Sequence, residues 1–179
     1  MSRIVKPVKV KRLAAEDVQV GELFTMNGVQ YIKLADYDTA ISCSRTIGIL
    51  ATTVLPLCEF DSNYSGNSKK SIEERAVCMF MAATIDAKND GIIAYGMPDA
   101  DDVWQFGHLI AQHVKDYWYV DNGIEDVLSS GDYLYVDEFC TICKGNEYDE
   151  KQDGVNRRLG VRALYSIDPD ATVYVKAKR

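Results

Sequence analysis

Hydrophobic and polar residues alternate over several short stretches of the chain, as they do in strands that bury one face. The first predicted strand starts near Val8, and two more cover Val18–Phe24 and Val29–Leu34. Asn27-Gly28 lies between the last two and predicts a tight hairpin, because both residues tolerate positive φ. The remaining predicted strands cover Ala40–Ser44, Thr52–Leu57, Tyr133–Val136, Val161–Tyr165 and Thr172–Val175.

Two other stretches repeat hydrophobic residues at helical spacing. Ser71-Ile72-Glu73-Glu74 has the pattern of a capping box and predicts the start of a helix. Pro98–Asp102 predicts the start of a second helix, whose first turn places acidic side chains at the positive end of the helix dipole. The buried face of this second helix would consist of Val103, Phe106, Ile110 and Val114. Together these elements predict a single α+β domain over residues 1–179, with an antiparallel sheet and two main helices.

Five segments, taken in chain order, resemble a group of bacterial and phage domains of C-type-lectin-like fold. Gly21–Phe24 and Tyr31–Leu34 are similar to the opening hairpin of these domains, and Met97–Trp104 is similar to the start of their helix. Tyr117–Tyr119 stands where the group carries an aromatic segment, and Gly160–Leu164 resembles its closing strand. The resemblance implies a C-type-lectin-like fold and a link to phages or other mobile elements. It also favours binding over catalysis.

The composition is typical of a globular protein, with 47% hydrophobic and 26% charged residues among 179. No apolar run approaches the roughly 20 residues that span a bilayer. No apolar segment follows the basic N-terminus, so we expect no signal peptide and a cytoplasmic location, in a host cell. The net charge of −7 predicts repulsion from nucleic acid and from anionic membranes. The expected partner is therefore a basic protein.

The acidic residues are concentrated in the C-terminal half of the chain. Asp99–Asp153 contains fourteen acidic and three basic residues, a net of −11, so the rest of the chain carries +4. Aromatic residues are interleaved with these acids, as in many interfaces. The alternative is that the aromatic residues form the core and the acids a solvated surface. The candidate partner-binding residues are Asp99, Asp101, Asp102, Glu125, Asp126, Asp137, Glu138, Glu147, Asp149 and Glu150.

Cys140 and Cys143 form a C-x-x-C pair that is followed by Lys144-Gly145, and such a pair can present two thiolates to one zinc ion. A tetrahedral site needs two more ligands, and the alternative is a pair of free thiols. The odd number of cysteines argues against a framework of disulfides. The candidates for the remaining ligands are Cys43, Cys58, Cys78, His108 and His113.

The sequence contains no nucleophile elbow, no phosphate-binding loop and no H-E-x-x-H motif, so we do not expect an enzyme. The leading hypothesis is a non-enzymatic phage or mobile-element protein, of the anti-CRISPR type, that blocks nucleic-acid loading of a Cas effector. Two alternatives remain. One is a lectin-like module that binds a receptor or glycan through Tyr117, Trp118 and the loop from Gly145 to Asn156. The other is a small regulatory domain stabilised by zinc.

Overall fold

Strands dominate the part of the chain that the computed structural model describes, which comprises residues 9–38, 45–56, 91–120, 132–146 and 159–177. Besides the strands, these residues include a short 3₁₀ turn, η1 (Ala15–Asp17), and an α-helix, α2 (Ala100–Ile110). The strands are β1 (Val10–Ala14), β2 (Leu23–Met26), β3 (Val29–Asp38), β4 (Arg45–Ala51), β5 (Leu55–Pro56), β6 (Ile92–Gly96), β7 (Trp118–Val120), β8 (Asp132–Val136), β9 (Ile142–Asn146), β10 (Gly160–Val161), β11 (Leu164–Ile167) and β12 (Thr172–Lys176).

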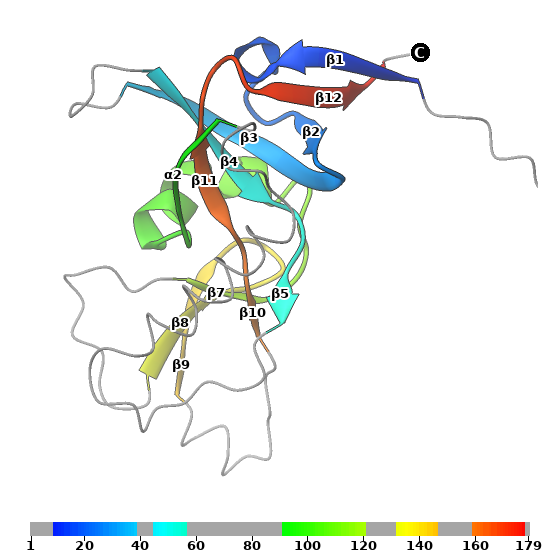
Figure 1. Cartoon of the computed structure of the whole chain (residues 1–179). Coiled ribbons are helices and arrows are strands. Elements are labelled where there is room, and N and C mark those ends of the chain that lie inside the picture. Colours follow the sequence, from blue (N-terminus) through cyan, green and yellow to red (C-terminus); the bar gives the residue numbers. More distant parts are fainter. Residues whose placement is uncertain (1–8, 39–44, 57–90, 121–131, 147–158, 178–179) are drawn as a thin grey trace, which may run out of the picture.

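The strands form two sheets. The larger sheet has seven strands in the order β1-β12-β2-β3-β4-β11-β6, and all of its pairs are antiparallel. The smaller sheet has five strands in the order β5-β10-β7-β8-β9, with β10 parallel to β7. Figure 1 shows the β1–β12 pair at the top of the molecule and the smaller sheet at the bottom, with α2 beside the larger sheet.

The prediction of an α+β fold with two main helices is wrong, because the described residues form a mostly β structure with one α-helix. The predicted helix from Ser71 and the predicted strand Ala40–Ser44 lie outside the described residues. The polar segment after Lys144 was predicted to be a loop, but it begins within β9, which pairs with β8 from Ile142 to Asn146. Within the described residues, no helix has the length and apolar character needed to cross a membrane.

The first hairpin confirms the turn prediction and shortens the strand before it. Asn27 and Gly28 have φ values of 49° and 79°, and they join β2 to β3 with Met26 opposite Val29. The strand predicted over Val18–Phe24 forms only from Leu23, because the chain first makes η1 and the turn that follows it. Alternation of side chains therefore located the turn correctly but not the start of the strand.

A buried lysine fixes η1 to the larger sheet. Lys33 on β3 has 1% of its surface exposed, and its Nζ donates to the carbonyl oxygens of Ala15 and Glu16, both at 3.1 Å. Asp36 completes the site with a carboxylate oxygen 2.9 Å from Nζ. Because each partner is an oxygen, the ammonium group is satisfied inside the protein and holds the turn in place.

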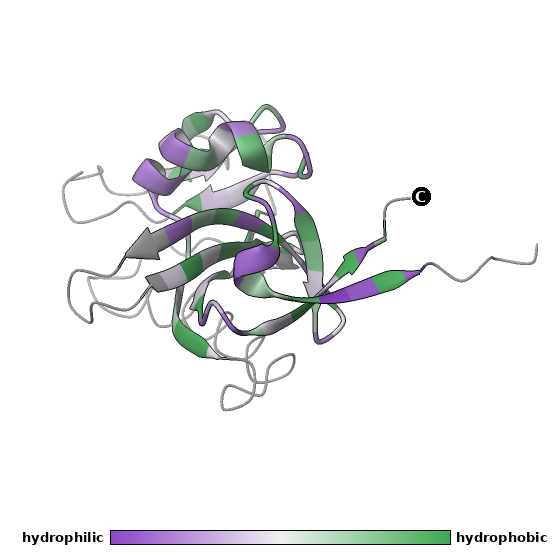
Figure 2. Cartoon of the chain, turned by 90° about the horizontal axis from the view of Figure 1, so that it is seen from above, coloured by the Kyte–Doolittle hydropathy of each residue, from purple (hydrophilic) through white to green (hydrophobic). Residues whose placement is uncertain are grey.

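Two hydrophobic clusters fill the fold, and both contain residues from each sheet. Cluster 1 includes Tyr31 and Tyr165 of the larger sheet and the tyrosines Tyr119, Tyr133 and Tyr135 of the smaller one. Cluster 2 lies on the opposite faces and is completed by the apolar side of α2. The predicted inner face of the helix is confirmed for Val103, Phe106 and Ile110, which are buried, whereas Val114 is buried but follows the end of α2. Figure 2 shows hydrophilic and hydrophobic residues alternating around α2 and along the strands.

The segment Val161–Tyr165 was predicted to be one strand, but it divides into β10 in the smaller sheet and β11 in the larger sheet. The division falls at Arg162, whose side chain is completely buried. Its guanidinium carbon lies 5.6 Å from the ring centroid of Trp118, on β7. A cation above the face of an indole ring is attracted by the negative potential of that face. Arg162 therefore lies where the chain passes from one sheet to the other.

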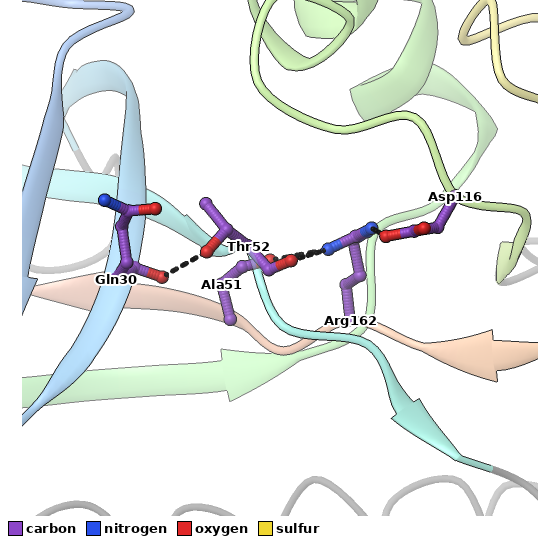
Figure 3. A network of polar contacts seen from close by, with 5 residues as sticks. All are labelled: Gln30, Ala51, Thr52, Asp116 and Arg162. Carbon is purple, nitrogen blue, oxygen red and sulfur yellow. Dashed lines mark hydrogen bonds and ion pairs between the residues drawn. The ribbon is translucent and has the colours of Figure 1, made fainter. Parts of the chain in front are cut away.

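The guanidinium of Arg162 also binds two other segments that connect the sheets (Figure 3). Nη1 donates to the carbonyl oxygens of Ala51, the last residue of β4, and of Thr52, which follows it on the way to β5. Nη2 donates to Asp116, between α2 and β7, at 3.1 Å. Thr52 in turn donates from its N–H (3.0 Å) and its Oγ1 (3.2 Å) to the carbonyl of Gln30 on β3. One side chain thus ties three connections between the sheets.

Replacement of Arg162 by Met should lower the free energy of unfolding by about 2–3 kcal/mol. Met fills much of the same space, but it leaves the carbonyls of Ala51 and Thr52 without their buried donor. Asp116→Asn should cost less than about 1 kcal/mol, because 68% of the Asp116 side chain is exposed and water can replace it. Urea denaturation of the two variants measures both values. Equal losses of unfolding free energy in the two variants would contradict a larger contribution from the hydrogen bonds to the buried carbonyls than from the ion pair with Asp116.

Candidate partner-binding surface

Two of the candidate acids start α2. Asp102 N–H donates to Asp99 Oδ1 at 2.8 Å, and Asp99 N–H donates to Asp102 Oδ2 at 3.2 Å. This reciprocal pair is a capping box, which satisfies two N–H groups that a helix start leaves without partners. The sequence correctly predicted where the helix begins. It did not predict that these two carboxylates accept backbone hydrogen bonds from each other's residues.

The carboxyl group of Asp102 is partly withdrawn from water. Burial raises its pKa, and the negative charges of Asp99 and Asp101 raise it further, whereas the hydrogen bond from the Asp99 N–H opposes the shift. Ionised Asp102 is therefore less stable in the fold than in an unfolded chain. Asp101 points into solvent and takes no part in the box.

A third candidate acid, Asp137, holds the turn between β8 and β9. Its Oδ1 accepts the N–H groups of Phe139 and Thr141, both at 2.9 Å. Its carbonyl oxygen accepts the N–H of Cys140 at 3.0 Å, and Cys140 adopts a φ of 61°. An aspartate that bonds to the backbone in this way fixes a tight turn. Glu138 and Phe139 are the residues that this turn exposes.

The β8–β9 turn packs against α2 at Gly107. A methyl group placed on Gly107 would lie 3.6 Å from the carbonyl oxygen of Cys140 and 3.8 Å from its Sγ. Trp104 precedes Gly107 by almost one helical turn on α2, and Phe139 directly precedes Cys140 in the turn. Trp104 is 77% exposed and Phe139 is 73% exposed. Large apolar side chains with so little burial mark an interaction site when they gather.

We define the α2–turn surface as four exposed residues on the two elements that meet at Gly107, namely Asp101 and Trp104 on α2 and Glu138 and Phe139 on the β8–β9 turn. Of the ten predicted acids, Asp101 and Glu138 belong to this surface. Asp99, Asp102 and Asp137 instead accept backbone N–H groups at the start of α2 and in the β8–β9 turn. The other five lie outside the described residues: Glu125, Asp126, Glu147, Asp149 and Glu150. Phe139 was not among the predicted binding residues, because the sequence around a single apolar residue does not indicate whether its side chain is exposed.

The other aromatic residues of the acidic segment are divided between core and surface. Tyr119, Tyr133 and Tyr135 are buried, and the rings of Tyr119 and Tyr133 meet edge to face at 5.4 Å. Trp118 is 1% exposed beneath Arg162 and is not accessible to a sugar. Tyr117 remains 42% exposed. The alternative that the aromatic residues form core therefore holds for Phe106, Trp118, Tyr119, Tyr133 and Tyr135 but not for Trp104, Tyr117 or Phe139, and Tyr148 lies outside the described residues.

The two thiols of the C-x-x-C pair pack against different clusters. Cys140 lies against cluster 2 and Cys143 against cluster 1, where Cys143 Sγ is 4.0 Å from Asp137 Oδ2. Burial raises the pKa of the Cys140 thiol, with Arg162 opposing the shift, so the thiol is protonated at neutral pH.

Among the described residues, no group of three or more metal-ligating side chains comes together. The remaining candidate cysteines, Cys43, Cys58 and Cys78, lie outside these residues. His108 is exposed on α2, and His113 Nε2 lies 2.8 Å from the carbonyl oxygen of Gly21. Zinc binding by Cys140 and Cys143 stays a prediction.

Comparison of the chain with known proteins finds no matching family model, no matching curated protein and no matching solved structure.

Asp102→Asn should leave the protein at least as stable as the wild type at neutral pH. The amide oxygen can still accept the Asp99 N–H, and the cost of a partly buried charge disappears. Since the folded-state pKa of Asp102 is raised, its contribution to stability is present at low pH and is lost as pH rises through that pKa. The stability of the variant relative to the wild type should therefore rise as the pH is increased from the acidic range.

Asp99→Ala is the matched variant for the same capping box. It should lower the free energy of unfolding by about 1 kcal/mol, because Ala cannot accept the Asp102 N–H. Thermal melts of both variants at acidic and neutral pH measure these effects. A large loss of stability in Asp102→Asn at neutral pH would contradict the role assigned to burial.

Proposed function

We propose that the protein is a non-enzymatic binding protein whose α2–turn surface docks onto a basic partner protein. The observation that carries this proposal is the exposure of Trp104 on α2 and of Phe139 on the turn that packs against α2, each with an exposed acid near it in sequence, Asp101 and Glu138. Aromatic residues in an interface supply most of the binding energy, while charges at the rim guide association and select partners of opposite sign.

The support beneath this surface is rigid, which favours binding. Trp104 is on a helix held by the capping box of Asp99 and Asp102. Phe139 is on a turn fixed by two hydrogen bonds to Asp137. Residues held in this way lose little conformational freedom when a partner binds, so less of the interaction energy is spent on ordering them.

The partner that we infer is a nucleic-acid-binding protein of the host cell, such as a Cas effector, whose basic channel the acidic surface would block. The excess of acidic residues between Asp99 and Asp153 supports this proposal, as does the resemblance of several segments to phage domains. Channels that bind nucleic acid are lined by Lys and Arg, and an acidic protein competes for the same charges. The proposed role implies activity in the cytoplasm and needs no catalytic group.

A labelled oligo-arginine peptide serves as the probe for this surface. The double variant Trp104→Ala with Phe139→Ala should weaken binding at least about tenfold, because two exposed aromatic contacts are removed. The variant Asp101→Asn with Glu138→Gln should reduce both the affinity and its dependence on salt. Fluorescence anisotropy at increasing ionic strength measures both effects.

Glu16→Gln with Asp17→Asn is the matched control, because it removes two exposed acids from η1, away from the α2–turn surface. This control should bind the peptide almost as tightly as the wild type does. Equal weakening by the control and by Asp101→Asn with Glu138→Gln would show that net charge alone drives binding, and it would remove the proposed surface. Displacement of a single-stranded oligonucleotide from a purified Cas effector then tests the inhibitory role.

A further inference from the structure

The two basic ends of the chain pair with each other in the structure. β1 and β12 run antiparallel, with Val10 opposite Lys176 and Arg12 opposite Tyr174. Residues 9–14 and 172–177 contain Lys9, Lys11, Arg12 and Lys176 and no acidic residue. The fold therefore gathers positive charge from the two ends of a chain whose net charge is −7. We call the paired strands β1 and β12 the basic ribbon.

The outer face of the basic ribbon combines charge with apolar surface. Val173 and Val175 point into cluster 1, so the residues that alternate with them point outward. Tyr174 is 42% exposed and Val10 is 62% exposed, and the basic side chains of Arg12 and Lys176 are exposed beside them. Arg12 donates to Thr172 Oγ1 at 3.2 Å, which orients its guanidinium along this face.

We propose that the basic ribbon of one molecule docks on the α2–turn surface of a second copy. The two surfaces are complementary, because Arg12 and Lys176 can meet Asp101 and Glu138 while the aromatic and aliphatic side chains pack between them. The basic ribbon forms one edge of the larger sheet, whereas α2 follows β6 at the other edge of that sheet. One molecule therefore cannot bring its own two surfaces together. This inference rests on the proposed function in that it uses the same α2–turn surface.

Such a contact is head to tail, and it leaves a free ribbon at one end of each pair and a free α2–turn surface at the other. Association is therefore open-ended and increases with protein concentration. The strands of the ribbon have five residues each, so the contact is small and the association weak and sensitive to salt. Each docked ribbon covers an α2–turn surface, so self-association competes with binding of the basic partner. Figure 2 shows the hydrophilic stretch of β1 beside the C-terminal strand.

Analytical ultracentrifugation of the full chain tests the proposal. The weight-average mass of the wild type should rise with concentration at low ionic strength and fall when salt is added. The ribbon variant Arg12→Glu with Lys176→Glu should stay monomeric, as should the surface variant Asp101→Asn with Glu138→Gln. Each variant retains one intact surface, so an equimolar mixture of the two should form a 1:1 dimer and nothing larger.

The mixture also shows that the variants are folded, because a misfolded chain cannot restore association. Tyr174→Ser should weaken association at least tenfold, whereas Tyr174→Phe should preserve it, since the exposed ring supplies the apolar contact. A wild type that remains monomeric at every concentration would overturn the proposal. So would a mixture that fails to form the dimer, or a ribbon that binds a single-stranded oligonucleotide while the chain stays monomeric.

The ribbon variant separates this inference from the proposed function. It keeps the α2–turn surface intact, so it should bind the oligo-arginine peptide at least as tightly as the wild type and should bind it better at high protein concentration. If the wild type is monomeric and the peptide still binds, self-association fails while the proposed function stands. Loss of peptide binding in the ribbon variant would count against both.

Discussion

The buried guanidinium of Arg162 is the interaction on which the relation between the two sheets depends. It lies over the ring of Trp118, donates hydrogen bonds to the carbonyl oxygens of Ala51 and Thr52, and donates another to the exposed carboxylate of Asp116. Burial lowers the pKa of Arg162 to about 10, with Asp116 opposing the shift, so the side chain remains charged at neutral pH. A charge in this position is tolerated because Nη1 and Nη2 donate to oxygen atoms and the guanidinium lies over the ring of Trp118, although Nε has no hydrogen-bond partner among the described residues.

The candidate surface follows from that junction. Asp116 and Trp118 fix the segment that leaves α2, and the face of β7 and β8 that contains Trp118 joins the apolar side of α2 in cluster 2. The β8–β9 turn then meets the helix at Gly107, where no side chain separates them. Trp104 and Phe139 are exposed on the two elements that make this contact, so the packing of the turn against the helix relates their backbone positions. The binding surface is thus a consequence of how the sheets are joined.

The sequence predicted the features of the fold that are determined by residues close together in the chain. The turn at Asn27-Gly28, the start of α2 at Asp99 and the buried side of that helix are all local, and they were correct. The strand predicted across Arg162 was wrong, because alternation continues through this residue. Its partners at Ala51 and Asp116 are distant in sequence, so local patterns do not reveal them. The pairing of β1 with β12 and the contact of Cys140 with Gly107 are long-range in the same sense.

The acids also divide in a way that composition does not show. Asp99, Asp102 and Asp137 satisfy backbone N–H groups, whereas Asp101 and Glu138 remain in solvent.

Amide hydrogen exchange in the presence and absence of the oligo-arginine peptide tests the central claim most directly. The account predicts that bound peptide slows exchange in residues 100–111 and 137–141 and leaves the η1 region unchanged. Binding of the peptide without protection of these two segments would contradict it.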